Sequence, residues 1–310
     1  MDKNYIISAL LNIIILLILP FFTIGIIKKT KAFFAGRKGV SIFQPLWDFL
    51  RLFKKGQVIS NTTSQVFKIA PVVVFATTLF AGLFAPMIGC YSIIEIEGAF
   101  VIFSYILGLG KFFSLIAAMD TGSSFEGMGA SREACFTTII EPAFFIILAS
   151  FIALNGNLTF KSLTGLLNVS GGFGVLIIAL SVVSLFIMLI VECARVPFDD
   201  PTTHLELTMV HEVMILDNSG IDLGILTWSA GMKMIILASL ITNLIIPSSL
   251  PFGLSILAYI LSIVFIALII GVIESAIARF RMSHVFEFVF IMSSLALVVA
   301  SLAVVKIYGV

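Results

Sequence analysis

The chain has 310 residues, of which 60% are hydrophobic and only 11% carry a charge. Soluble proteins carry about 25% charged residues, so this composition excludes an ordinary soluble domain and indicates a helical protein with many membrane spans. The formal net charge of +1 gives no electrostatic support for nucleic-acid binding. The three cysteines stand far apart without a CxxC pair; we expect inert, buried thiols that hold no iron–sulfur cluster.

Apolar runs long enough to cross about 30 Å of hydrocarbon predict eight transmembrane helices. We expect an all-α fold in which residues 1–310 form one membrane domain, a single helical bundle. The runs lie near residues 5–27, 68–89, 98–118, 136–154, 173–194, 228–247, 252–274 and 285–306.

The distribution of lysine and arginine predicts the orientation of the bundle. Eight basic residues lie in the first connection, at 28–55, and Arg132, Arg195, Arg279 and Arg281 lie in the third, fifth and seventh. The opposite side has only Lys3, Lys161 and Lys306 outside the helix cores. We expect a multi-pass protein of the cell's inner (cytoplasmic) membrane. Because basic loops stay in the cytoplasm, both termini should lie on the outer side of this membrane.

A short amphipathic helix is predicted to begin at Pro45 and to lie at the membrane interface. Its apolar residues follow the i, i+3, i+4, i+7 pattern and its charged residues occupy the other face: Leu46, Phe49, Leu50 and Phe53 against Asp48, Arg51 and Lys55. The helix is either a basic membrane anchor or a docking element for a soluble partner.

Ionisable residues also occur within or at the ends of the predicted spans. They are Lys111, Glu141, Glu192, Lys233, Glu274 and Glu287. Each would cost roughly 2.5–3.5 kcal/mol at the bilayer centre, so we expect them to face the bundle interior and to partner one another or water. Glu133 and Glu141, eight residues apart, can point from one helix towards a common interior. Such groups either join helices as ion pairs or form a proton relay.

The segment 192–222 concentrates seven of the seventeen acidic residues beside a single basic one. This pattern favours a proton or ion route or a docking surface. The segment also holds His204, Glu206, His211 and Glu212, which are residue types that bind metals. His211-Glu212 is followed by Val-Met-Ile and so does not form an HExxH motif; we expect no metal site.

Four motifs resemble the membrane-anchor family that includes subunit 1 of respiratory complex I and its relatives in group 4 membrane-bound nickel–iron hydrogenases. They are E-x-x-R-x-P-F-D at 192–199, G-A-S-R-E at 129–133 with E-P at 141–142, G-R-x-G at 36–39 with Q-P-L-x-D at 44–48, and D-x-S-G at 217–220. The resemblance covers nearly the whole chain and includes the eight spans.

Departures from the complex I pattern favour the hydrogenase branch. Complex I subunits typically follow P-F-D with three glutamates, of which only Glu206 is present here, and tend to carry arginine at the position of Glu274. Hydrogenase relatives resemble this chain at Glu274, at A-R-x-R over 278–281, and at Trp228 and Lys233. The resemblance therefore implies a subunit of a hydrogenase-4-type or formate-hydrogenlyase-like complex.

The resemblance implies that the chain anchors a soluble electron-transfer arm and has no redox centre of its own. The expected partners are hydrogenase large and small subunits, an iron–sulfur subunit and antiporter-like membrane subunits, with the nickel–iron centre and iron–sulfur clusters held by the partners. Residues expected on a proton path are Glu133, Glu141, Glu192, Glu206, Asp217, Glu274 and Lys233. Residues expected to dock the arm are Arg37, Asp48, Arg132, Arg195, Asp199, Asp200, His204, His211 and Glu212.

Two other functions remain open. A quinone-binding subunit of a complex I-like oxidoreductase would need an amphipathic chamber near Pro197–Glu206. A stand-alone ion transporter is disfavoured because the sequence shows none of the inverted repeats that many transporters have.

Overall fold

A computed structural model describes residues 3–88, 92–156, 158–160, 172–200, 209–247 and 250–308. Over these residues the fold is all-α, and eight helices are long and apolar enough to cross a membrane, as the sequence predicts. They are α1 (Lys3–Phe34), α3 (Gln65–Phe84), α4 (Ala99–Asp120), α5 (Ser124–Asn155), α7 (Gly172–Glu192), α8 (Gly220–Ile245), α9 (Phe252–Ala276) and α10 (Met282–Tyr308).

The helix ends differ from those of the predicted apolar runs, and the largest differences are at the starts of α5 and α8. Helix α5 begins at Ser124 rather than near residue 136, and α8 begins at Gly220 rather than near residue 228. Their first turns carry Glu126 and Asp222, acidic residues that the positive end of a helix favours. A hydropathy window misses such polar turns although the backbone continues through them.

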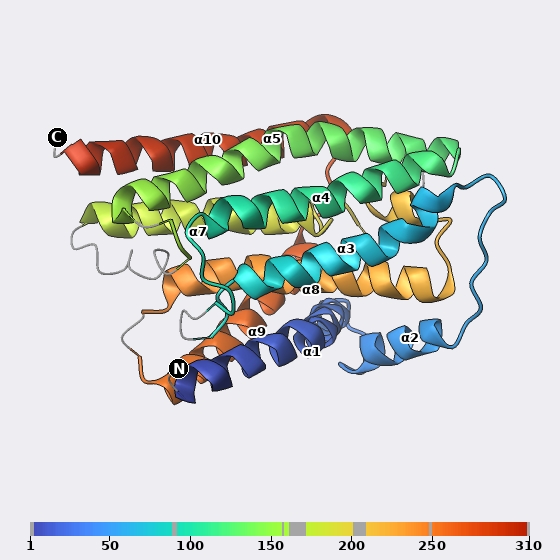
Figure 1. The fold of residues 1–310 in the computed structure, drawn as a ribbon, viewed down its shortest axis with the longest axis horizontal. Helices are drawn as coiled ribbons and strands as arrows, with labels where there is room; N and C mark the ends of the chain where they lie inside the picture. The colour runs from blue at the N-terminus through green and yellow to red at the C-terminus, as the bar shows by residue number, and fades with distance from the viewer. Residues whose placement is uncertain are drawn as a thin grey trace.

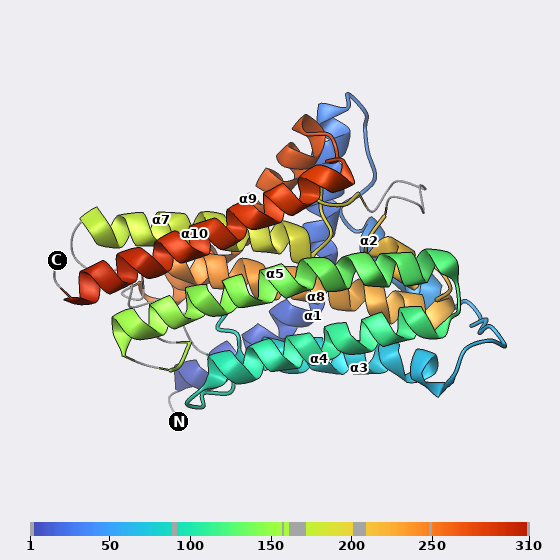
Figure 2. The same ribbon diagram turned by 90° about the horizontal axis from the view of Figure 1, so that it is seen from above.

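The eight helices run lengthwise beside one another, and both chain termini lie at the same end (Figure 1). The other end holds the connections from α1 to α3, α4 to α5, α7 to α8 and α9 to α10. Helix α3 packs between α4 and α8, while α10 packs against α5 and α7. Figure 2 shows α9 and the C-terminal part of α1 leaning together away from the other helices.

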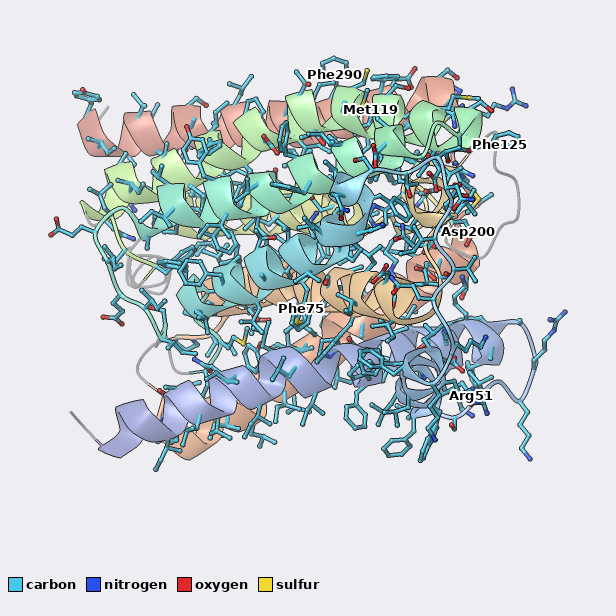
Figure 3. The ribbon with its side chains drawn as sticks, turned by 45° about the vertical axis from the view of Figure 1, so that its right-hand side comes forward. Arg51, Phe75, Met119, Phe125, Asp200 and Phe290 are labelled. Carbon is cyan, nitrogen blue, oxygen red and sulfur yellow. The ribbon has the colours of Figure 1, made fainter. Side chains whose placement is uncertain are left out.

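The amphipathic helix of the first connection is α2 (Gln44–Phe53), which begins one residue before the predicted Pro45. The ring centroid of Phe49 lies 5.1 Å from that of Phe21 and 4.9 Å from that of Trp228 in α8, so this residue faces the bundle. On the predicted apolar face Leu50 and Phe53 are exposed, as expected for side chains that contact lipid at the interface, whereas Asp48 borders a cavity. Arg51 lies on the outer side of α2 (Figure 3).

Helix α5 packs directly against the connection between α7 and α8, which contains the short helix η2 (Glu212–Ile215). A Cβ added to Gly129 would lie 2.9 Å from the carbonyl oxygen of Val210 and would overlap Val213. Arg132, one turn further along, donates to the carbonyl oxygen of Met209 at 3.0 Å. The glycine therefore allows a close approach that places His211 against the bundle.

Candidate functional site

A cluster of opposite charges lies inside the bundle, built by four helices. Glu192, the last residue of α7, lies between two lysines. Lys111 of α4 is 2.6 Å from one carboxylate oxygen, and Lys233 of α8 forms an ion pair with the other. Glu133 of α5 is 3.6 Å from Lys111. The expectation that these intramembrane charges face inward and partner one another is confirmed.

The cluster contains two positive and two negative groups, so it is neutral when all four are ionised. This balance matters because an isolated buried charge is costly to desolvate, whereas paired and hydrogen-bonded charges offset much of that cost. Both oxygens of Glu192 are engaged, which makes this carboxylate the centre of the cluster.

Two small cavities adjoin the cluster. One, of about 60 Å³, is lined by the four charged residues together with Thr78, Ser114 and Ser229. The other, of about 30 Å³, is lined by Glu141 together with Lys111, Glu192 and Lys233. Glu133 and Glu141 thus face a common interior, as their spacing predicts. Cavities of this size that border charged side chains are roomy enough to hold water.

A larger chamber of about 570 Å³ lies between α1, α2, α8 and the residues that follow α7. Its wall is largely apolar, with Phe21, Phe49 and Trp228. It also carries a second ionic group, in which Glu274 is 3.0 Å from Lys31 and 3.5 Å from Arg195. Glu274 therefore belongs to the chamber and not to the cluster around Glu192.

Asp199 organises the connection that separates the chamber from the cluster. Its side chain is fully buried and lies 3.1 Å from Arg279. One carboxylate oxygen accepts hydrogen bonds from the backbone N–H groups of Val210 and His211, at 2.9 and 3.1 Å. Asp199 thereby joins the turn after α7 to the start of η2 and fixes the backbone of His211.

Glu212 follows His211 and borders the chamber. Burial raises the pKa of this carboxyl group, and the nearby charges of His211 and Arg195 oppose that effect. Raising the pKa favours the protonated carboxyl, so Glu212 binds a proton at higher pH than an exposed glutamate does.

Comparison with known proteins identifies the family. The sequence pattern described as NADH dehydrogenase matches residues 7–305. The chain belongs to this family. Hydrogenase-4 component C of Escherichia coli (strain K12) is 28% identical over 292 residues, covering 90% of each chain. Formate hydrogenlyase subunit 4 of the same strain is 24% identical, over 83% of this chain and 85% of that protein.

Two further comparisons show a partial similarity in sequence and a similarity in fold. NADH-ubiquinone oxidoreductase chain 1 of Trichosurus vulpecula is 30% identical over 166 residues, which are 51% of this chain and 52% of that protein. A chain in the structure of the membrane-bound sulfane sulfur reductase, an archaeal respiratory membrane complex, has the same fold. It superposes with a TM-score of 0.80 at 20% identity, covering 96% of this chain and 99% of that one.

The remaining residues predicted for the proton path are spread more widely in this NADH dehydrogenase family member. Asp217 is exposed, and its backbone N–H donates to Glu126, away from the cluster. Glu206, like His204 of the predicted docking set, lies outside the residues that the structure describes. Glu287, expected to face inward, is instead exposed and pairs with His284 at 3.1 Å; that expectation is wrong.

The described residues among those predicted to dock a soluble arm lie at the end of the bundle that holds the first, third and fifth connections. Figure 3 shows Arg51 of α2 and Asp200 of the fifth connection at this end. Arg37 is exposed, Asp48 accepts from Gln44 at 2.8 Å, and Asp200 is half-buried. Arg132, Arg195, Asp199, His211 and Glu212 are engaged within the protein as described above.

Sequence reasoning missed two interior residues. Lys111 was recognised as a charge within a span but was not assigned to the proton path, although a lone lysine inside the run 98–118 is the signal that finds it. Glu126 is fully buried, and one of its oxygens accepts the N–H of Asp217 at 2.8 Å. Cys135, expected to be buried, is exposed on α5.

Proposed function

We propose that this protein is the integral membrane subunit of a respiratory oxidoreductase complex of the membrane-bound hydrogenase type. It anchors the soluble electron-transfer arm in the cytoplasmic membrane and contributes a carboxylate path for protons. The observation that carries this proposal is the full-length similarity to hydrogenase-4 component C, combined with a cluster of paired charges inside the bundle.

The soluble arm binds the connections at residues 34–55, 119–135 and 195–222, whose described residues lie at one end of the bundle. The arm brings the nickel–iron centre and the iron–sulfur clusters, in hydrogenase large and small subunits and an iron–sulfur subunit. No group of three or more His, Cys, Asp or Glu residues within the described part of this chain is placed to hold a metal. Antiporter-like membrane subunits receive the protons laterally.

Glu141 is the residue that takes up and releases the proton. Around the two small cavities, Lys111 and Lys233 face three glutamates, so one carboxyl group is in excess of the lysines. Glu133 and Glu192 already pair with lysines. Protonation of Glu141 makes the five groups neutral together, and its deprotonation leaves one net negative charge.

Charge movement in the arm drives this exchange through electrostatic interactions. Two unit charges about 4 Å apart interact by about 4 kcal/mol at an effective dielectric constant of 20. The pKa of a carboxyl group changes by one unit for each 1.36 kcal/mol of interaction free energy. A charge that moves near the acidic connection therefore changes how often a nearby carboxyl group is protonated.

The test is proton translocation by the intact complex in inverted membrane vesicles. We expect Glu141→Gln and Glu192→Gln to abolish translocation while hydrogen chemistry is at least partly kept. Glu287→Gln, which removes an exposed carboxylate, is the matched control and should translocate normally. Unchanged translocation in both interior variants would contradict the proton path, and purification of the chain as a lone, transport-competent protein would contradict the complex.

A quinone-binding function is the second candidate, and the chamber of about 570 Å³ favours it. Its aromatic wall can receive a hydrophobic ring, and its ionic group of Glu274, Lys31 and Arg195 can interact with the polar edge. A quinone-site inhibitor should then block electron transfer in the complex. No inhibition at saturating concentration would exclude this candidate.

A further inference from the structure

The chamber and the cluster cavity share two wall residues among the described part of the chain, His211 and Ala230. The methyl group of Ala230 carries no exchangeable proton. His211 is therefore the one shared wall residue with an ionisable side chain. It is half-buried, as expected for a side chain between two cavities.

The position of His211 is fixed from several sides. Its backbone N–H donates to buried Asp199, and the residues before it contact α5 at Gly129 and Arg132. Its own carbonyl oxygen accepts from Met214 at 3.1 Å within the turn of η2. A backbone held in this way keeps the imidazole at the boundary between the cavities.

We propose that His211 transfers protons between the chamber and the buried Lys111–Glu192 cluster. This role deepens the proposed proton path and rests on it. An imidazole suits the position because its two nitrogens are separate, so one can accept a proton while the other donates one. It also explains why a histidine, rather than another carboxylate, occupies a wall beside two lysines and two glutamates.

The transfer balances in protons and charge. A hydronium ion in the chamber gives a proton to one ring nitrogen, which leaves water and forms the imidazolium. The proton on the other nitrogen then passes through the cluster cavity to the carboxylate of Glu141, which becomes neutral, and the ring is neutral again. Its remaining proton returns to the original nitrogen by rotation of the ring or by exchange with water. No electron and no other reactant is required.

The test uses the whole complex in inverted vesicles and measures protons translocated per electron pair separately from hydrogen turnover. We expect His211→Gln, which keeps a hydrogen-bonding side chain but cannot ionise, to lower the translocation rate by about a hundredfold. Hydrogen turnover in an uncoupled assay should fall far less than translocation, because the side chain holds no redox centre, so that fewer protons are moved per electron pair. His284→Gln, at an exposed histidine, is the matched control and should change neither quantity.

A second variant separates proton transfer from a structural role. His211→Ala leaves space at the cavity wall, so added imidazole should restore translocation in this variant and not in His211→Gln. A wild-type ratio of protons to electrons in either variant without added imidazole would overturn the role of His211 but leave the proposed function intact. Equal loss of turnover and translocation without imidazole rescue would also overturn it, since that result indicates a structural residue. A wild-type complex that translocates no protons would instead contradict the proposed path itself.

Discussion

Glu192 shows how a single residue determines the electrostatics of the interior. Each of its carboxylate oxygens has its own lysine, one from α4 and one from α8. Because Lys111 also approaches Glu133, it is shared by two carboxylates. Removing Lys111 would leave three charges where four were balanced.

We expect Lys111→Met to destabilise the protein by about 3–5 kcal/mol, the usual result of breaking a buried ion pair from one side. Lys111→Met combined with Glu133→Gln should recover much of this loss, because Lys233 and Glu192 then remain as a neutral pair. The measurement is thermal unfolding of the purified complex in detergent. Lys54→Met, in the exposed first connection, is the control. A double variant as unstable as the single one would show that charge balance is not the cause.

The sequence predicts which charged residues lie within the apolar helices, but it does not predict how these residues pair. A lysine or glutamate within an apolar run is visible at once, and the cost of exposing it to lipid predicts that it faces inward. The sequence does not show which residue it pairs with, because the four residues of the cluster lie on four different helices and are up to 122 positions apart. They are Lys111, Glu133, Glu192 and Lys233. Glu274 was grouped with them by chemistry, yet the tilt of α1 and α9 gives it Lys31 and Arg195 instead.

At the scale of elements, α8 joins the surface helix α2 to the buried cluster. Trp228 contacts Phe21, Phe49 and Phe75 with ring centroids 5.8, 4.9 and 5.0 Å away, and its indole N–H donates to the carbonyl oxygen of Leu17 at 3.0 Å. The N-terminus of α8 also binds the loop after α2, where Gln57 donates to Asp222. Aromatic contacts of this kind add to the stability that burial provides.

We therefore expect Trp228→Ala to release α2 locally while the bundle stays folded. Amide hydrogen exchange over residues 44–53 should become about tenfold faster or more, because local opening requires less free energy once this packing is lost. Trp47→Ala is the matched control, since the other tryptophan is on α2 itself but is 54% exposed. Faster exchange in the control than in Trp228→Ala would show that α2 is held by its outer face instead.

The elements were predicted better than their ends and faces. Hydropathy identifies the eight spans because each must bury about twenty apolar residues in lipid. It fails at the start of α5 and α8, where polar first turns continue the helix into the connections. In α2 periodicity identifies the apolar face, but it could not say that Phe49 on this face contacts the protein while Leu50 is exposed.

At the scale of the whole molecule, the three cavities follow one another from the end that holds the connections into the interior of the bundle. The chamber reaches His211, His211 borders the cluster cavity, and the cluster borders the cavity of Glu141. Helices from distant parts of the chain supply every wall. This arrangement follows from the fold, so no local motif in the sequence could reveal it, although the E-x-x-R-x-P-F-D motif marks its middle.

The same fold makes a prediction about orientation in the membrane. Eight spans place both termini on one side, and the eight basic residues of the first connection predict that this side is outside. Alkaline phosphatase fused after Val310 should therefore be active and green fluorescent protein dark at that position. Fusions after Lys38, in the first connection, should give the opposite result and serve as the internal control. If the fusion after Val310 fluoresced while the one after Lys38 had phosphatase activity, the protein would be inverted and the chamber would open away from a cytoplasmic arm.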